Sequence, residues 1–195
     1  MYILGASRHA KSVIDQLESI HLVEGVFDDN PEIISILGLE VNSPIPDTFS
    51  EDLPIHIAIG DNSLRKSISQ RLPSGATFIN ILHNSAIVSK YARLGKGIVM
   101  MERTIVKVDT SVGNHVIINT AASIDHDCQI SDFVHIAPNA CLCGNVEIGE
   151  GTLVGAGSVI LPGVKVGKWC VIGGGSVVHK DMPDGSKWIG SKNIC

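Results

Sequence analysis

Three histidines whose side chains could take part in catalysis or metal binding lie in the hydrophobic C-terminal part of this 195-residue chain, at positions 115, 126 and 135. His126 lies in the run Asp125-His126-Asp127, between two carboxylates. A neighbouring carboxylate keeps one imidazole nitrogen protonated and raises the basicity of the other, as a general base requires. The sequence therefore predicts that His126 is a base oriented by Asp127. The alternative is a surface histidine beside two surface acids.

A repeat of six residues determines where these side chains lie. Every sixth residue from Leu82 to Val178 is apolar, without an insertion. A period of six fits neither an α-helix nor an ordinary strand, and hexapeptide repeats are typical of parallel β-helices. The fifth residue of each hexad is mostly small or β-branched, which suits an inward position. The second residue is often Gly, which predicts a corner where the backbone needs conformational freedom.

The first eighty residues show a different pattern, in which short apolar strands alternate with amphipathic helices. Such an order is typical of a small α/β unit with a mostly parallel sheet. We therefore expect a Rossmann-like domain over residues 1–80 and a β-helix over residues 81–195. The predicted strands cover residues 1–4, 23–27, 55–59 and 77–82, and the predicted helices cover residues 9–20 and 63–72.

Polar turns follow three of the predicted strands, at Gly5–His9, Asp28–Asp29 and Gly60–Asn62. Ligands of parallel α/β sheets bind beyond the carboxyl ends of the strands. The first turn also opens a helix, whose N-terminal amides favour a phosphate. The turn is not a GxGxxG motif, so the sequence does not indicate a dinucleotide. Ordinary turn residues are the alternative to a ligand site.

The composition of the chain limits the kinds of partner and the cellular compartment that the protein can have. A net charge of −5 argues against nucleic acid as a partner. No apolar run reaches the ~18 residues that a membrane span needs, and the N-terminal residues show no signal-peptide pattern. The five cysteines have no disulfide-framework spacing and are expected to be reduced. These observations predict a cytoplasmic protein without a membrane partner.

Both halves of the chain together resemble the sialic acid O-acetyltransferase-like family of hexapeptide-repeat acyltransferases, which includes UDP-4-amino-sugar N-acetyltransferases. That resemblance implies a left-handed parallel β-helix in which three hexads form one coil, so that residues 18 apart stack. The motifs that carry it are Gly5-Ala6-Ser7-x-His9, Phe27-Asp28-Asp29, Ala58-Ile59-Gly60-Asp61-Asn62, Ile118-Asn119-Thr120, Ile124-Asp125-His126-Asp127-Cys128, His135, Gly144-Asn145-Val146-x-Ile148-Gly149 and Gly173-Gly174-Gly175.

An 18-residue coil assigns positions to the remaining candidates. Pro138, Ala156 and Gly174 fall on one line, where the two small residues would leave a shallow groove for a thin ligand such as a pantetheine arm. His126 and His135 are half a coil apart, so they lie on different sides of one prism. A site that contains both would need two subunits. Three histidines could instead bind zinc or iron, but separations of 11 and 9 residues do not stack them, so no metal site is expected.

The resemblance implies acetyl transfer from acetyl-CoA to a UDP- or dTDP-linked 4-amino sugar in bacterial surface glycan biosynthesis, by a homotrimer. One alternative is a sialic acid O-acetyltransferase, and another is a non-catalytic scaffold that binds a nucleotide sugar. Arg8 occupies a place where the family usually has Gly, and the C-terminal residues 190–195 also depart from its pattern.

The resemblance also assigns roles to residues. His126 corresponds to the base and Asp127 to the carboxylate that raises its basicity, while a backbone amide near Gly144 would meet the oxyanion. Acetyl-CoA would contact His135, Gly144, Ala156 and Gly174. The nucleotide sugar would contact Ser7, Arg8, His9, Asp28, Asp29 and Gly60.

Overall fold

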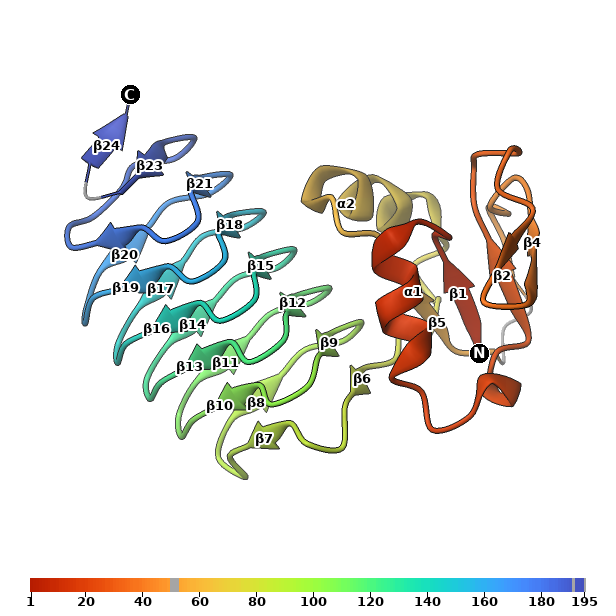
Figure 1. The fold of residues 1–195 in the computed structure, drawn as a ribbon, viewed down its shortest axis with the longest axis horizontal. Coiled ribbons are helices and arrows are strands. Elements are labelled where there is room, and N and C mark those ends of the chain that lie inside the picture. Colours follow the sequence, from red (N-terminus) through yellow and green to blue (C-terminus); the bar gives the residue numbers. More distant parts are fainter. Residues whose placement is uncertain (50–52, 191, 195) are drawn as a thin grey trace. The chain divides into compact units, whose positions relative to one another are not determined.

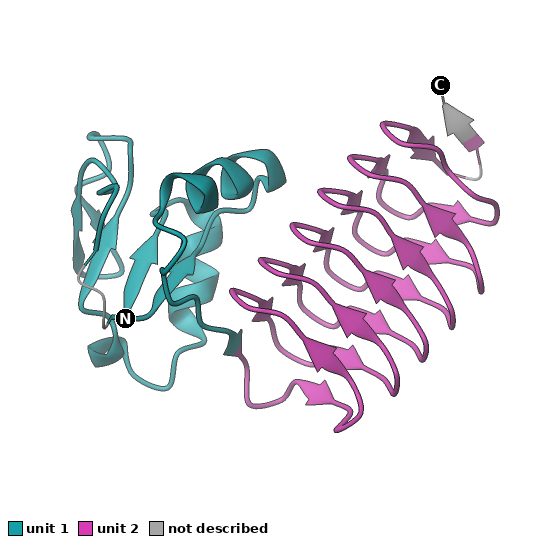
Figure 2. Ribbon diagram, turned by 180° about the vertical axis from the view of Figure 1, so that it is seen from behind, with its two compact units in different colours: residues 1–81 teal, residues 82–195 magenta. Residues whose placement is uncertain are grey.

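The computed structural model describes residues 1–49, 53–190 and 192–194. The chain divides into two compact units, residues 1–81 and residues 82–195, which Figure 2 shows in different colours. None of the helices among the described residues is long and apolar enough to cross a membrane.

The first unit is built on a five-stranded sheet with the order β3-β4-β2-β1-β5. Strands β1, β2, β4 and β5 are parallel, and β3 pairs antiparallel with β4. This arrangement confirms the predicted α/β class (Figure 1). Its elements are β1 (Tyr2–Leu4), α1 (Arg8–Asp15), the short 3₁₀ helix η1 (Ile20–Leu22), β2 (Gly25–Phe27), β3 (Ser35–Ile36), β4 (Leu39–Asn42), β5 (Ile55–Ile57) and α2 (Asn62–Arg71).

Element boundaries in this unit differ from the sequence prediction. Helix α1 ends at Asp15, five residues before the predicted end. The hairpin β3–β4, in a stretch without clear periodicity, is made by a turn in which Leu37 and Gly38 both have positive φ. The strand predicted over residues 77–82 is reduced to one bridge at Phe78 and to β6 (Ile81–Leu82). Strands of only two or three residues leave little periodicity in the sequence, so the sequence predicts their ends poorly.

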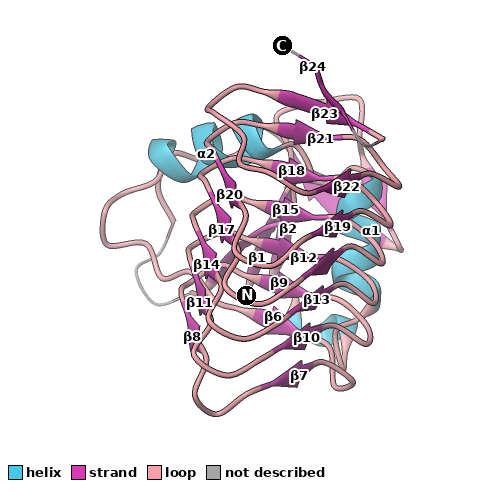
Figure 3. Cartoon of the chain, turned by 90° about the vertical axis from the view of Figure 1, so that its left-hand side faces the viewer, coloured by secondary structure: helices cyan, strands magenta, loops and turns pink. Residues whose placement is uncertain are grey.

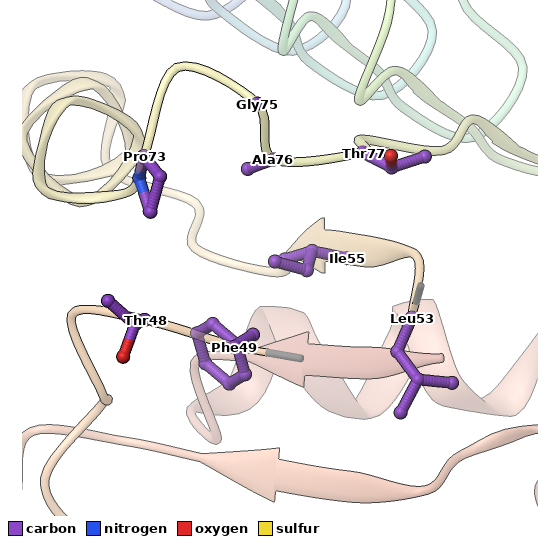
Figure 4. Close-up of a pocket in the computed structure, with 8 residues that line it drawn as sticks. All are labelled: Thr48, Phe49, Leu53, Ile55, Pro73, Gly75, Ala76 and Thr77. Carbon is purple, nitrogen blue, oxygen red and sulfur yellow. The ribbon is translucent and has the colours of Figure 1, made fainter. Parts of the chain in front are cut away.

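The hydrophobic core of the first unit borders a cavity of about 430 Å³ that the predicted polar turns do not line. Figure 4 shows the residues around it, which include Phe49, Leu53 and Ile55. Among the residues that the structure describes, the lining includes no titratable side chain and none of the residues predicted for a ligand site.

The second unit is a parallel β-helix, which confirms the fold class predicted from the hexads (Figure 3). Its strands form three sheets, named here by a central strand. The β13 sheet contains β7 (Ile87–Val88), β10 (Ile105–Val106), β13 (Ser123–Ile124), β16 (Cys141–Leu142), β19 (Val159–Ile160) and β22 (Val177–Val178). The β14 sheet contains β8 (Arg93–Leu94), β11 (Ser111–Val112), β14 (Gln129–Ile130), β17 (Glu147–Ile148) and β20 (Lys165–Val166). The β15 sheet contains β6, β9 (Val99–Met100), β12 (Ile117–Ile118), β15 (His135–Ile136), β18 (Leu153–Val154), β21 (Val171–Ile172), β23 (Lys187–Ile189) and β24 (Lys192–Ile194).

Strands of neighbouring coils pair in parallel with a register of 18 residues, which shortens to 16 where β21 pairs with β23 at the end of the chain. Ser123 pairs with Ile105 on one side and with Cys141 on the other. Three hexads therefore complete one coil, as predicted. The first and fifth residues of the hexads fill the interior of the prism. Examples at 3% exposure or less are Ile118, Ile124, Ile130 and Ile136 from first positions, and Val116, Ala122, Cys128 and Val134 from fifth positions.

The glycines at second hexad positions are required for a reason other than the one predicted. Gly149 has no positive φ, but a Cβ there would lie 2.5 Å from the backbone carbon of Gly167 on the next coil. Positive φ falls instead on the fourth position of the hexads. Non-glycine residues such as Asp127, Asn139 and Asn145 adopt it there. At Gly149, the glycine is therefore needed for the spacing of the coils and not for a left-handed turn.

Two substitutions separate these causes. Gly149→Ala should lower the free energy of unfolding of the coil by about 1–3 kcal/mol, the usual cost of overpacking. Gly175→Asn should leave it nearly unchanged, because Gly175 has φ +68° and open space around it, and Asn tolerates that conformation. Urea denaturation followed by tryptophan fluorescence measures the coil alone, since both tryptophans, Trp169 and Trp188, lie in the second unit. Equal losses in both variants would contradict the assignment.

Candidate active site

His126 occupies the corner that follows β13, and its imidazole is bound to the next residue. Its Nδ1 lies 2.7 Å from Oδ2 of Asp127. Asp127 has φ +60°, the left-handed conformation of fourth positions, at this bonded corner. The side chain of His126 is 54% exposed. The two residues thus form a histidine–carboxylate pair at the surface of one coil.

The protonation of His126 follows from this contact. The hydrogen bond with Asp127 raises the pKa of His126, and the charges of Asp125 and Asp127 raise it further. A slight loss of hydration and the charge of Lys107 lower it by less. Because Nδ1 donates to the carboxylate, the neutral ring keeps its lone pair on Nε2. Nε2 is therefore the atom that can accept a proton from a substrate.

Asp125 has a separate task, which is to hold the backbone of the corner. Its Oδ1 accepts the N–H of His126 at 2.8 Å. The Asp125 carbonyl oxygen accepts the hydroxyl of Thr110 at 2.7 Å. Thr110 is itself fully buried on the preceding coil. The corner that carries His126 is thus held by one hydrogen bond to the side chain of Asp125 and by a second one from the buried hydroxyl of Thr110.

Gly144, one coil after His126, makes room for the imidazole. A Cβ at Gly144 would lie 2.6 Å from Cε1 and 2.7 Å from Nε2 of His126. Any side chain there would displace the base. The carbonyl oxygen of Gly144 accepts the N–H of Gly163 at 3.0 Å, whereas its own N–H has no acceptor among the described residues. An amide without an acceptor in the chain can stabilise a negative oxygen.

His135 lies on β15, in a different sheet from the strand that precedes His126. Its Nε2 is 3.2 Å from Nδ2 of Asn119. Oδ1 of Asn119 accepts the N–H of Thr120 at 2.8 Å, which fixes the orientation of the amide. The amide nitrogen therefore donates to Nε2, which leaves Nδ1 as the nitrogen that carries the proton of the neutral ring.

Asn119 was not among the residues predicted to act at the site. It stands in the Ile118-Asn119-Thr120 motif, but 16 residues before His135, outside the 18-residue line. The signal that could have found it is a polar pair directly after a buried strand. Thr120 continues the chain of contacts, because its hydroxyl donates to Glu102 at 3.1 Å.

Pro138, Ala156 and Gly174 stack as the 18-residue spacing predicts. The N–H of Gly157 donates to the carbonyl of Pro138 at 2.9 Å, and the N–H of Gly175 donates to that of Ala156 at 2.8 Å. A Cβ at Gly174 would be 3.2 Å from the Ala156 oxygen. These residues follow strands of the β15 sheet, so they share a side with His135. His126 and Gly144 lie at another corner, after strands of the β13 sheet.

His115 takes no part in either group. It follows β11 of the β14 sheet, is 6% exposed and stacks on Phe133 with 5.1 Å between ring centroids and 8° between planes. The three histidines therefore lie on different parts of the coil. No group of three metal-ligating side chains is found among the described residues.

In the first unit, the structure brings the first and third polar turns together. Gly5 has φ +102°, and a Cβ there would lie 2.6 Å from Ile59. Gly60 leaves space beside His9, whose Cβ would be 3.5 Å from a Cβ at position 60. Ser7 precedes α1 without a side-chain cap, and Arg8, the first helical residue, is exposed.

The two neighbouring aspartates of the second turn differ in role. Asp28 accepts the N–H of Ala6 at 2.7 Å and so joins the first turn. Asp29 forms an ion pair with Arg71 at 2.5 Å and accepts the N–H of Ile45 at 3.0 Å. Partial burial would raise the pKa of Asp29, but Arg71 and the Ile45 amide together hold it below its usual value. The Asp29 carboxylate is thus engaged within the protein.

Known proteins match this chain in both units. The PglD N-terminal domain matches residues 1–72, and the bacterial transferase hexapeptide repeat matches residues 145–180. PerB from Caulobacter crescentus, whose structure holds CoA and GDP-perosamine, is 32% identical, with a TM-score of 0.87, over 99% of this chain and 95% of that one. The chain belongs to the hexapeptide-repeat sugar N-acetyltransferases.

Further relatives of this acetyltransferase family agree. The acetyltransferase domain of PglB from Neisseria gonorrhoeae is 31% identical, with a TM-score of 0.88, over 99% of this chain and 97% of that one. The UDP-N-acetylbacillosamine N-acetyltransferase of Bacillus subtilis is 49% identical over 51 residues, 26% of this chain. That match spans 24% of the Bacillus protein, and a match to an uncharacterised mimivirus protein also spans 24% of its length.

The contact between His126 and Asp127 predicts a titration in this family member. Asp127→Asn removes the carboxylate, so the pKa of His126 should fall and the acidic limb of kcat/KM should move to lower pH. The sign follows because the carboxylates now raise that pKa. NMR titration of the imidazole measures it. Asp109→Asn, at the same position one coil earlier, is the matched control, and an unchanged His126 pKa in Asp127→Asn would contradict the pairing.

Proposed function

We propose that this protein transfers the acetyl group of acetyl-CoA to the amino group of a nucleotide-linked 4-amino sugar, carried by UDP or dTDP, in the cytoplasm. The product would enter bacterial surface glycan biosynthesis. The observation that carries the proposal is the His126–Asp127 pair packed over Gly144, whose N–H has no acceptor among the described residues. A base and an oxyanion donor at one corner are the parts that acyl transfer to an amine requires.

In this mechanism, Nε2 of His126 accepts the proton of the sugar amine as the nitrogen attacks the thioester carbonyl. The N–H of Gly144 donates to the oxygen that becomes negative in the tetrahedral intermediate. Collapse of the intermediate breaks the carbon–sulfur bond, forms the amide and releases the CoA thiolate, which takes the proton back from His126. While His126 is protonated, Asp127 stabilises the imidazolium by accepting the hydrogen bond from Nδ1.

The acetyl-CoA site is proposed along His135, Ala156 and Gly174. The Asn119 contact at Nε2 favours the tautomer with its proton on Nδ1, and an imidazole N–H is the donor that a thioester carbonyl needs. Small residues stacked on successive coils expose backbone along which a pantetheine arm fits. Gly144 contributes from the corner of the base, so the proposed cofactor residues come from two sides of the coil.

The nucleotide sugar is proposed to bind the first unit through Ser7, Arg8, His9, Asp28, Asp29 and Gly60. The exposed Arg8 beside the N-terminus of α1 supports a phosphate contact, since amides and guanidinium both favour an anion. The ion pair of Asp29 with Arg71 favours an indirect role for that residue. A sialic acid O-acetyltransferase remains the rival enzyme, and a nucleotide-sugar-binding scaffold is the rival of another class.

A thiol-release assay with acetyl-CoA tests the function. UDP-, dTDP- and GDP-linked 4-amino sugars and free sialic acid are compared as acceptors, and release is expected with a nucleotide amino sugar. His126→Ala should lower kcat by about 10²–10⁴, the usual share of general base catalysis. Release with sialic acid alone would favour the rival enzyme. Release with none of the acceptors would favour a scaffold, and wild-type turnover in His126→Ala would refute the mechanism.

We also propose a homotrimer with each site between two subunits. The outward residues of the β14 sheet are Arg93, Ser111, Gln129, Glu147 and Lys165, a polar face. The outward residues of the β13 sheet are Ile87, Ile105, Ser123, Cys141, Val159 and Val177, a mostly apolar face. A contiguous apolar face supports a protein contact, and three-fold packing would bring different sides of neighbouring prisms together. His126 and His135 could then meet across a boundary.

Mixed subunits test the shared site. His126→Ala and His135→Ala proteins should each be nearly inactive, and subunit exchange between them should restore part of the activity. Restoration is expected because some interfaces then carry both intact residues. Light scattering gives the oligomeric state, and a mixture of His126→Ala with wild type gives the exchange control. Two folded variants that exchange subunits and recover nothing would locate both histidines in the site of one subunit.

A further inference from the structure

Arg65 is a charged residue buried in the first unit, outside the set of residues predicted for the site. It lies in the first turns of α2 and is 1% exposed. Arginine is almost never fully buried unless its donors are engaged. Here Nη1 donates to the carbonyl oxygens of Ile59 at 2.9 Å and Gly60 at 3.3 Å. Nη2 donates to Oδ1 of Asn62 at 2.8 Å.

The charge of Arg65 is retained despite this burial. Loss of hydration lowers the pKa of Arg65 to about 9, and the charge of Asp61 opposes the shift. At neutral pH the guanidinium is therefore protonated and keeps all of its donors. Only a planar fork reaches two carbonyl oxygens and a side-chain amide at once, so Lys is not an equivalent residue.

The turn that Arg65 binds is also held from the solvent side. Asp61 caps α2, because its Oδ1 accepts the N–H of Leu64 at 2.8 Å and the hydroxyl of Ser63 at 2.6 Å. Gly60, between these two sets of bonds, packs against His9. The turn lies at the carboxyl end of β5, where parallel sheets bind ligands.

We propose that Arg65 is a positioning residue for the nucleotide-sugar site. It fixes the turn over residues 59–62 from inside the protein, so that Gly60 and His9 keep the spacing that the nucleotide requires. Arg65 itself does not touch the ligand. This inference rests on the proposed function, since it assumes that the turn belongs to a nucleotide site.

The test measures binding of UDP, dTDP and GDP to the full chain by calorimetry, without acetyl transfer. For the nucleotide that the wild-type protein binds best, Arg65→Met should raise Kd by about 10-fold or more. Arg65→Lys should raise it by less, because it keeps the charge and loses the fork. In the thiol-release assay, both variants should raise the KM for the nucleotide sugar and leave the KM for acetyl-CoA unchanged.

Ile68→Ala is the matched control for simple destabilisation. Ile68 is 2% exposed in the same helix and is not bonded to the turn by its side chain. This variant should lower the Tm of the first unit as Arg65→Met does, while nucleotide Kd stays at the wild-type value. Circular dichroism at 222 nm follows that unit, since α1 and α2 both lie in it.

Three results would overturn the inference. Wild-type nucleotide affinity in a folded Arg65→Met variant would show that the turn does not need Arg65 to position it, and the proposed function would stand. An equal rise in Kd in Ile68→Ala would reduce Arg65 to a stability residue. If the wild-type protein binds none of the three nucleotides, both the positioning role of Arg65 and the nucleotide site of the first unit are refuted. Acetyl transfer to another acceptor would still be measurable in that case.

Discussion

The register of 18 residues between coils is the constraint on which the second unit depends. Backbone bonds such as Asp125 N–H to Leu142 O, at 3.0 Å, hold each coil on the next in parallel. Once this register is set, residues 18 positions before and after a side chain lie directly below and above it. His126 therefore lies over position 144, and that position has no side chain. Gly144 is required for the position of the His126 ring, because a methyl group there would occupy the place of the imidazole.

Prediction from the sequence was most successful where this register acts. Inward positions accept only apolar or small residues, so an uninterrupted period of six is enough by itself to identify the coil. Backbone conformation was less visible. Positive φ falls on fourth positions held by Arg103, Asp109 and His115 as well as by glycines, so glycine alone does not mark it. Glycine at the second position reflects contact with the next coil, and a contact between coils leaves no local pattern in the sequence.

In the candidate site, too, contacts between adjacent residues could be predicted from the sequence, whereas contacts that depend on the tertiary structure could not. The His126–Asp127 contact joins adjacent residues and could be predicted from the sequence. The Asn119–His135 contact spans 16 residues and leaves the regular line. The ion pair of Asp29 with Arg71 spans 42 residues and depends on how β2 and α2 fold together. The burial of Arg65 was equally hidden, since a basic residue in a polar helix is normally taken as exposed.

The environment of His126 also argues for a covered site in the proposed assembly. Two carboxylates raise its pKa, and half of its side chain meets solvent in the single chain. A base with a raised pKa is protonated in more molecules near neutral pH, and solvent weakens the field of the Gly144 amide. Burial acts in the opposite direction, because loss of hydration lowers the pKa of an imidazole. In the proposed assembly, a neighbouring subunit or a bound substrate over this corner would lower the pKa of His126 by removing hydration and would exclude water at the same time. If His126 is the base, the proposed packing would therefore tune the exposed His126–Asp127 pair as well as complete the groove.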